Sequence, residues 1–65
     1  MIEQITIKEI PFNFVRRNDH SLLLLGSDYC DFDLTSYLIN NLPENIVNIS
    51  ELCRTIEVLI ERYNQ

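Results

Sequence analysis

The chain has 65 residues, a net charge of −5 and an apolar content of 46%. This length allows one domain at most, residues 1–65, and the apolar content is too high for a disordered tail. The acidic balance argues against direct nucleic-acid binding, because neutralising phosphates requires a basic stripe. The longest unbroken apolar run, residues 22–25, is far too short to cross a membrane.

The small size of the chain also limits its stability. A protein of this mass buries only about 60% of the surface that its unfolded form exposes. The gain from apolar burial then nearly equals the entropy cost of ordering the chain. We therefore expect a marginally stable monomer that gains stability from a partner protein or from a second copy in a homodimer.

Near the N-terminus, apolar and polar residues alternate as they do in strands. The apolar positions of residues 5–7 and of residues 10–14 have opposite parity. A bulge or a short turn at Lys8 and Glu9 accounts for this change. Residues 2–16 are therefore expected to form either one kinked strand or two short strands.

A polar cluster at residues 16–21 separates this region from a run of four leucines. Such a cluster is typical of a β-hairpin tip, so residues 22–25 are the next expected strand. An unbroken leucine run before Gly26 suits a strand that is covered on both faces or lies near the sheet centre. Pro11 has no N–H to offer a neighbouring strand, which predicts a sheet edge or a break there.

The C-terminal half carries helical patterns. Asp33 is a suitable N-cap for a short helix that Pro43 would end. Residues 40–48 are compatible with helix, strand or loop, and these alternatives stay open. The clearest element is an amphipathic helix from Asn48 to Tyr63, with apolar residues at spacings of three and four.

The long helix begins with a capping-box-like pair, Asn48 and Glu51. Val58 falls off its apolar stripe, and Tyr63 ends the stripe, so both are expected contacts for a second copy. Taken together, the elements predict a small α+β domain of order ββ(β)αα. Its helices would cover one face of an antiparallel hairpin or three-stranded sheet.

Charge divides the chain unequally. Residues 1–27 are neutral, whereas residues 28–65 hold seven acidic residues against two arginines, a net charge of −5. Two regions are candidate protein-binding sites: a basic turn and an acidic stretch. Their residues are Arg16, Arg17 and Asn18 in the turn, and Asp28, Tyr29, Asp31 and Asp33 in the stretch.

The acidic stretch does not match a calcium loop, because the glycine and glutamate that such a loop needs are missing. His20 beside Asp19 is interpreted as a turn residue, since an exposed tip excludes no water. Cys30 and Cys53 are expected to be reduced thiols; a metal or redox role for them would make stability depend on the thiols. We therefore expect no enzyme activity, no cofactor and no bound metal.

The first residues show no basic segment followed by an apolar run, so a cytoplasmic location is expected. The expected function is a small acidic protein that binds a partner protein as a regulator or inhibitor. Phages and mobile elements encode such proteins as anti-defence or antitoxin-like factors. The alternative is a structural or assembly subunit whose C-terminal helix forms a homo-oligomer seam.

Overall fold

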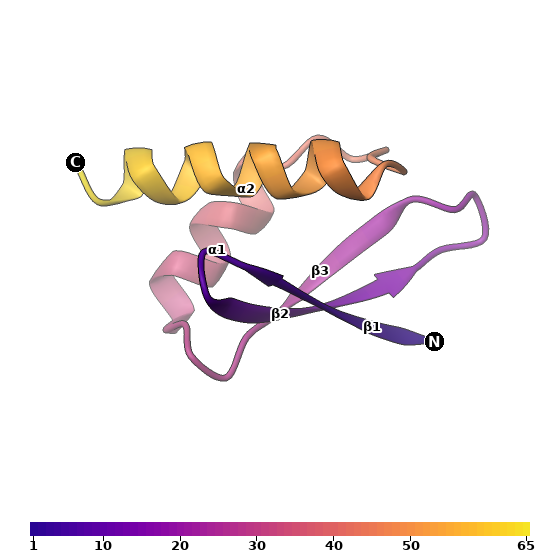
Figure 1. Ribbon diagram of the computed structural model, residues 1–65, viewed down its shortest axis with the longest axis horizontal. Helices are drawn as coiled ribbons and strands as arrows, with labels where there is room; N and C mark the ends of the chain where they lie inside the picture. The colour runs from indigo at the N-terminus through magenta and orange to yellow at the C-terminus, as the bar shows by residue number, and fades with distance from the viewer.

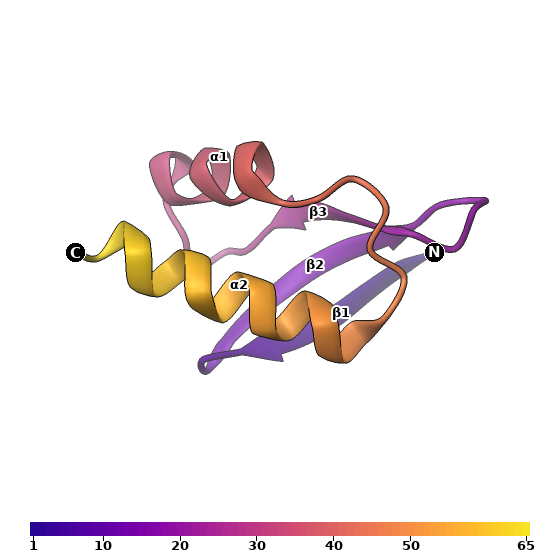
Figure 2. The same ribbon diagram turned by 90° about the horizontal axis from the view of Figure 1, so that it is seen from above.

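The computed structural model describes all 65 residues and contains three strands followed by two helices. The strands form one antiparallel sheet in the order β1-β2-β3. Both helices lie over the same face of this sheet (Figure 1, Figure 2). The predicted α+β class is confirmed. The elements are β1 (Ile2–Ile7), β2 (Ile10–Arg16), β3 (Leu22–Gly26), α1 (Phe32–Asn41) and α2 (Ile49–Tyr63).

A two-residue turn joins β1 to β2. Ile7 pairs with Ile10, and the intervening Lys8 and Glu9 have positive φ angles of 51° and 68°. Turns with two positive φ angles match the twist of a hairpin, although Asn and Gly usually occupy them. The turn accounts for the change of parity in the sequence, and two short strands rather than one kinked strand occupy this region.

Pro11 lies in the central strand, where proline is unusual. It pairs with Thr6, next to the pair that closes the turn, so its nitrogen points away from β1. β3 pairs with β2 only from Asn13 onwards and leaves that side of Pro11 open. The strand is therefore a local edge at Pro11, in agreement with the sequence prediction.

β3 is an edge strand, so the prediction that its leucines are covered on both faces or lie near the sheet centre is wrong. Leu22 and Leu24 are buried, whereas Leu23 and Leu25 are 42% and 45% exposed. The helices cover only one face, so the two-residue period of a strand exposes every second leucine. A bulge at Leu25 follows, and Gly26 then adopts a φ of 138° that other residues rarely tolerate.

The core lies between the sheet and the helices. α1 lies above β3, whereas α2 crosses above β1 and β2 (Figure 2). α1 buries only Leu38, while four buried side chains come from α2. The buried apolar residues are Ile7, Phe12, Phe14, Leu22, Leu24, Leu38, Ile46, Leu52, Ile56, Leu59 and Ile60.

α1 begins earlier than predicted. The Oδ1 atom of Asp31 accepts a hydrogen bond from the N–H of Leu34 at 2.8 Å, so Asp31 and not Asp33 is the N-cap. Three aspartates lie close together here, and residue type alone did not distinguish them. Asp33 lies in the first turn, where its charge interacts favourably with the helix dipole. After α1 ends, residues 42–48 form a loop with one turn and no strand.

α2 confirms the clearest sequence prediction. The Oδ1 atom of Asn48 accepts a hydrogen bond from the N–H of Glu51 at 3.0 Å and caps the helix. The Glu51 side chain accepts no hydrogen bond from the N–H of Asn48, so only one half of the predicted capping box forms. Its apolar stripe buries Leu52, Ile56 and two later residues against the sheet and α1. Neither α2 nor α1 has the length and apolar character that a membrane crossing requires.

Candidate protein-binding site

The face of the sheet opposite the helices has no covering layer (Figure 1). Ile2, Val15 and Leu23 lie in register across the three strands and form an apolar row on this face. Ile2 is 65% exposed, and Leu25 adds a second exposed apolar side chain on β3. Exposed apolar side chains that gather on one face are typical of an interaction surface.

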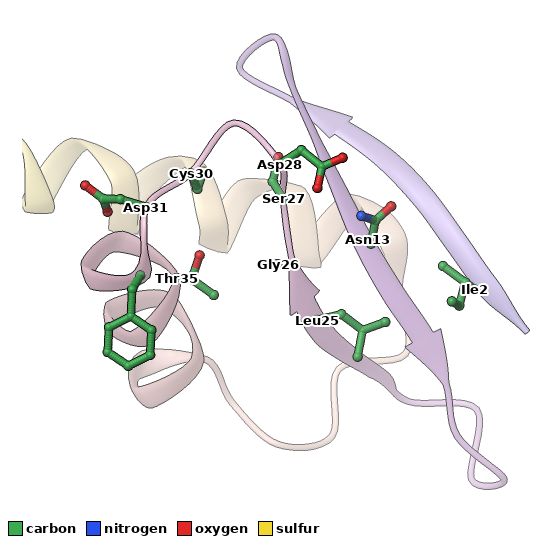
Figure 3. A pocket seen from close by; sticks show the side chains of 10 residues that line it. Ile2, Asn13, Leu25, Gly26, Ser27, Asp28, Cys30, Asp31 and Thr35 are labelled. Atoms are coloured by element: carbon green, nitrogen blue, oxygen red, sulfur yellow. The ribbon is translucent and has the colours of Figure 1, made fainter.

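An open hollow of about 510 Å³ lies where this face meets the loop between β3 and α1 (Figure 3). Figure 3 shows that the strands supply Ile2 and Leu25, while the loop supplies Asp28 and Asp31. Phe32, the first residue of α1, adds a third large apolar side chain to the lining. We call this site the acid-rimmed hollow, because its lining includes two carboxylates and no basic side chain.

The loop that forms the rim is shaped by local hydrogen bonds. The Ser27 hydroxyl accepts a hydrogen bond from the N–H of Tyr29 at 3.1 Å, and the Ser27 carbonyl accepts one from Cys30 at 3.2 Å. This tight turn places Asp28 and Tyr29 at its tip, and Tyr29 is 76% exposed. The next carboxylate, on Asp31, is fixed by its role as N-cap. These hydrogen bonds set the positions of Asp28 and Asp31 at the rim.

The predicted acidic stretch coincides partly with this site. Asp28 and Asp31 line the hollow, whereas Tyr29 and Asp33 do not. Partial desolvation raises the pKa of Tyr63 at the end of α2, and the charges of Asp31 and Asp33 raise it further.

Sequence reasoning missed the apolar half of the site. Phe32 is 81% exposed, and it stands between two aspartates without the helical spacing of a core residue. That isolated position in the sequence could have indicated that Phe32 is exposed. Leu25 belonged to a uniform leucine run, which gave no sign of which leucines face solvent. Ile2 stood near the chain start, and only the pairing of β1 and β3 with β2 brings it to the same hollow as Leu25.

The predicted basic turn lies at the other end of β3 (Figure 1). The Nε atom of Arg16 is 3.0 Å from Oε2 of Glu3, which forms an ion pair. Arg17 donates from Nε to the Ser21 hydroxyl at 2.9 Å and from Nη2 to the Glu44 carbonyl. Both arginines therefore hold the hairpin tip in place from within the chain. Their role in binding a partner stays a prediction.

A buried serine organises the same turn. Oδ1 of Asp19 accepts hydrogen bonds from the Ser21 hydroxyl at 2.5 Å and from the Ser21 N–H at 3.0 Å. These bonds lower the pKa of Asp19. Asn18 is exposed in this turn, and His20 follows it with a φ of 70°. His20 thus serves the turn geometry, as the sequence indicated.

The two cysteines are free and half-buried. Burial raises the pKa of Cys30, and the charge of Asp31 raises it further. A raised pKa lowers the thiolate fraction, so Cys30 is a poor nucleophile. No three His, Cys, Asp or Glu side chains gather closely enough to hold a metal ion.

The predicted oligomer contacts lie at the margin of α2. Val58 is 41% exposed, and Tyr63 is 38% exposed. The ring centroid of Tyr63 lies 5.2 Å from that of Tyr37, so its ring packs against α1. Only part of each side chain is therefore available to a second copy.

Comparison of the chain with protein-family models, curated proteins and solved structures finds no match. The site is therefore interpreted from its own geometry. That geometry combines exposed apolar side chains with carboxylates in an open, ordered hollow. The hollow is open to solvent and not enclosed.

Proposed function

We propose that this chain is a small interaction module that binds a basic, partly apolar surface of a partner protein. The acid-rimmed hollow supports the proposal, since Leu25 and Phe32 are exposed beside the carboxylates of Asp28 and Asp31. Apolar side chains at the centre of an interface supply affinity. Carboxylates around them favour basic partners and speed their association.

Arginine and lysine side chains fit this hollow particularly well. Their aliphatic stems cover apolar surface while the charged head reaches a polar rim. In the hollow, the stem would lie along Leu25 and Phe32 and the head would approach Asp28. The net charge of −5 on residues 28–65 attracts such a partner over a longer range.

A regulator or inhibitor that occupies its partner's surface is the functional class proposed here, and phage or mobile-element proteins of the anti-defence or antitoxin type belong to it. The acid-rimmed hollow offers the contact surface that such a protein needs. Two free thiols are consistent with a reducing compartment such as the cytoplasm.

The test begins with affinity capture of the partner from the native host, identified by mass spectrometry. Binding of that partner is then compared for Asp28→Lys, Phe32→Ser and a control, Glu44→Lys. Glu44 is exposed and lies outside the hollow. Each hollow variant is expected to weaken binding about tenfold or more, as central interface residues do. Equal affinity of Glu44→Lys and the hollow variants would contradict the proposal.

The alternative is an assembly subunit, for which the half-exposed Val58 of α2 is the supporting feature. Light scattering separates the two functions. A monomer that captures a partner supports the interaction module. A stable homo-oligomer that is disrupted by Val58→Glu, and that captures nothing, supports the assembly subunit.

A further inference from the structure

The outer edge of β1 presents an unpaired row of backbone groups. The ladder with β2 alternates, so Ile2, Gln4 and Thr6 direct their N–H and C=O groups away from β2. No backbone or side-chain hydrogen bond of the chain reaches these groups. The edge is therefore a template on which a further strand can pair.

β1 also lacks most of the features that usually protect an edge strand, and its one inward-facing charge, Glu3, is paired with Arg16 of β2. It contains no proline and no bulge, and its only lysine neighbour, Lys8, lies in the turn beyond it. No loop residue forms a hydrogen bond with the outer edge of β1. On β3, by contrast, the carbonyl of the loop residue Ile46 accepts a hydrogen bond from the N–H of Leu22 at 2.9 Å. Six residues of strand remain open to pairing.

Acidic side chains of α2 lie on the side of this edge that faces the helices. α2 crosses above β1 (Figure 2). Oε1 of Glu61 lies 3.7 Å from Nζ of Lys8, just after β1, and Glu57 lies one helical turn earlier on the same side of α2. Below them, Ile5 is only partly buried. An added strand would place alternate side chains between Ile5 and these carboxylates.

We infer that β1 takes up an extended, basic segment of a protein partner as a fourth strand of the sheet. Main-chain hydrogen bonds to Gln4 and Thr6 provide the pairing, and alternate side chains provide selectivity. Lysine or arginine fits the inward positions, because its stem covers Ile5 and its head reaches Glu57. This edge shares only Ile2 with the acid-rimmed hollow and takes a different kind of segment, so the inference goes beyond the function proposed above.

Charge distinguishes this occupant from a second copy of the chain. In an antiparallel pair of β1 strands related by a two-fold axis, both α2 helices lie on the same side of the joined sheet. Each copy has a net charge of −5, so the two copies would repel one another. Like charges oppose this pairing, whereas a basic segment neutralises them.

The test uses an acetylated octapeptide in which lysine alternates with valine or threonine, and a second peptide with glutamate in place of lysine. Binding to the full chain is followed by NMR through amide chemical shifts and hydrogen exchange. The lysine peptide is expected to shift β1 amides and to slow exchange at Gln4 and Thr6 about tenfold at saturation. The glutamate peptide is expected to bind at least about tenfold more weakly.

Two variants of one position isolate the backbone contribution. Gln4→Pro removes an N–H that points outward and leaves the ladder with β2 intact, whereas Gln4→Ala removes only the side chain. Gln4→Pro is expected to weaken the lysine peptide about tenfold, while Gln4→Ala retains its affinity within about twofold. Glu57→Lys, with Glu44→Lys as control, tests the charge contribution even if the proline variant does not fold.

Four results would overturn the inference. They are equal binding of the two peptides, peptide shifts centred away from β1, unchanged affinity of Gln4→Pro or Glu57→Lys, and concentration-dependent protection of Gln4 without peptide, which would identify a second copy. Phe32→Ser separates the two proposals. It is expected to leave peptide binding unchanged, so a failure at β1 says nothing against the hollow.

Discussion

The two edges of the sheet are treated differently by the same small chain. On β3, a loop carbonyl occupies the N–H of Leu22, and a bulge at Leu25 interrupts the strand. On β1, the backbone groups of Ile2, Gln4 and Thr6 have no partner. Short or bulged edges resist pairing with other chains, whereas a regular open edge invites it. β1 is therefore the more open of the two edges, whereas β3 is closed by its own chain at Leu22 and interrupted at Leu25.

The largest expected effect comes from Phe14, which joins the two edges through β2. Phe14 is fully buried and pairs with Glu3 on β1 and with Leu24 on β3. Phe14→Ala is expected to cost about 3–5 kcal/mol, enough to unfold a marginal domain. Urea unfolding followed by circular dichroism measures the loss. Val15→Ala, on the open face, is the control. An equal loss of unfolding free energy in Phe14→Ala and Val15→Ala would show that the two edges do not share one core.

Gly26 tests the closed edge. Its φ of 138° at the β3 bulge is strained for any other residue, so Gly26→Ala is expected to cost about 1–3 kcal/mol. An added Cβ would lie 3.4 Å from Cγ2 of Thr35, an ordinary contact at its tight limit. Thermal melting of Gly26→Ala, alone and combined with Thr35→Ser, separates backbone strain from crowding against Thr35. Full rescue by Thr35→Ser would assign the loss to crowding instead of backbone strain.

Asn48 tests the helix that lies above β1. Its side chain caps α2, so Asn48→Ala is expected to cost about 1 kcal/mol, whereas Asn48→Asp keeps the acceptor and costs less. Because α2 covers the β1 side, hydrogen exchange of β1 amides is expected to accelerate more than that of β3 amides. Uniform acceleration across the sheet would show that the two sides open together.

The smallest expected effect is on pH dependence at the hairpin tip that leads into β3. Hydrogen bonds from Ser21 lower the pKa of Asp19 in the folded chain below its unfolded value of about 3.9. The stabilising contribution is therefore present above that value and is lost as the pH falls through the folded pKa. Asp19→Asn is expected to flatten the fall in melting temperature between about pH 5 and pH 2. An unchanged pH profile would remove Asp19 from this role.

Much of the candidate site follows from residue type, but its assembly does not. Asp28 and Asp31 were visible as an acidic stretch, and they line the hollow. The apolar side came from Ile2, Leu25 and Phe32, which are far apart in the sequence or hidden in a leucine run. Only strand pairing, and a helix that begins at Phe32, bring these side chains to one place.

The sequence by itself determined the local elements, because strand alternation, helical spacing and the Asn48 cap act between residues that are near in the chain. The change of parity located an interruption at Lys8 and Glu9, and the structure shows that it is a turn and not a bulge. Tertiary structure decided which sheet face the helices cover, and hence that Leu23 and Leu25 face solvent. It also decided which edge is closed. Both depend on contacts between residues far apart in the chain, which local pattern does not encode.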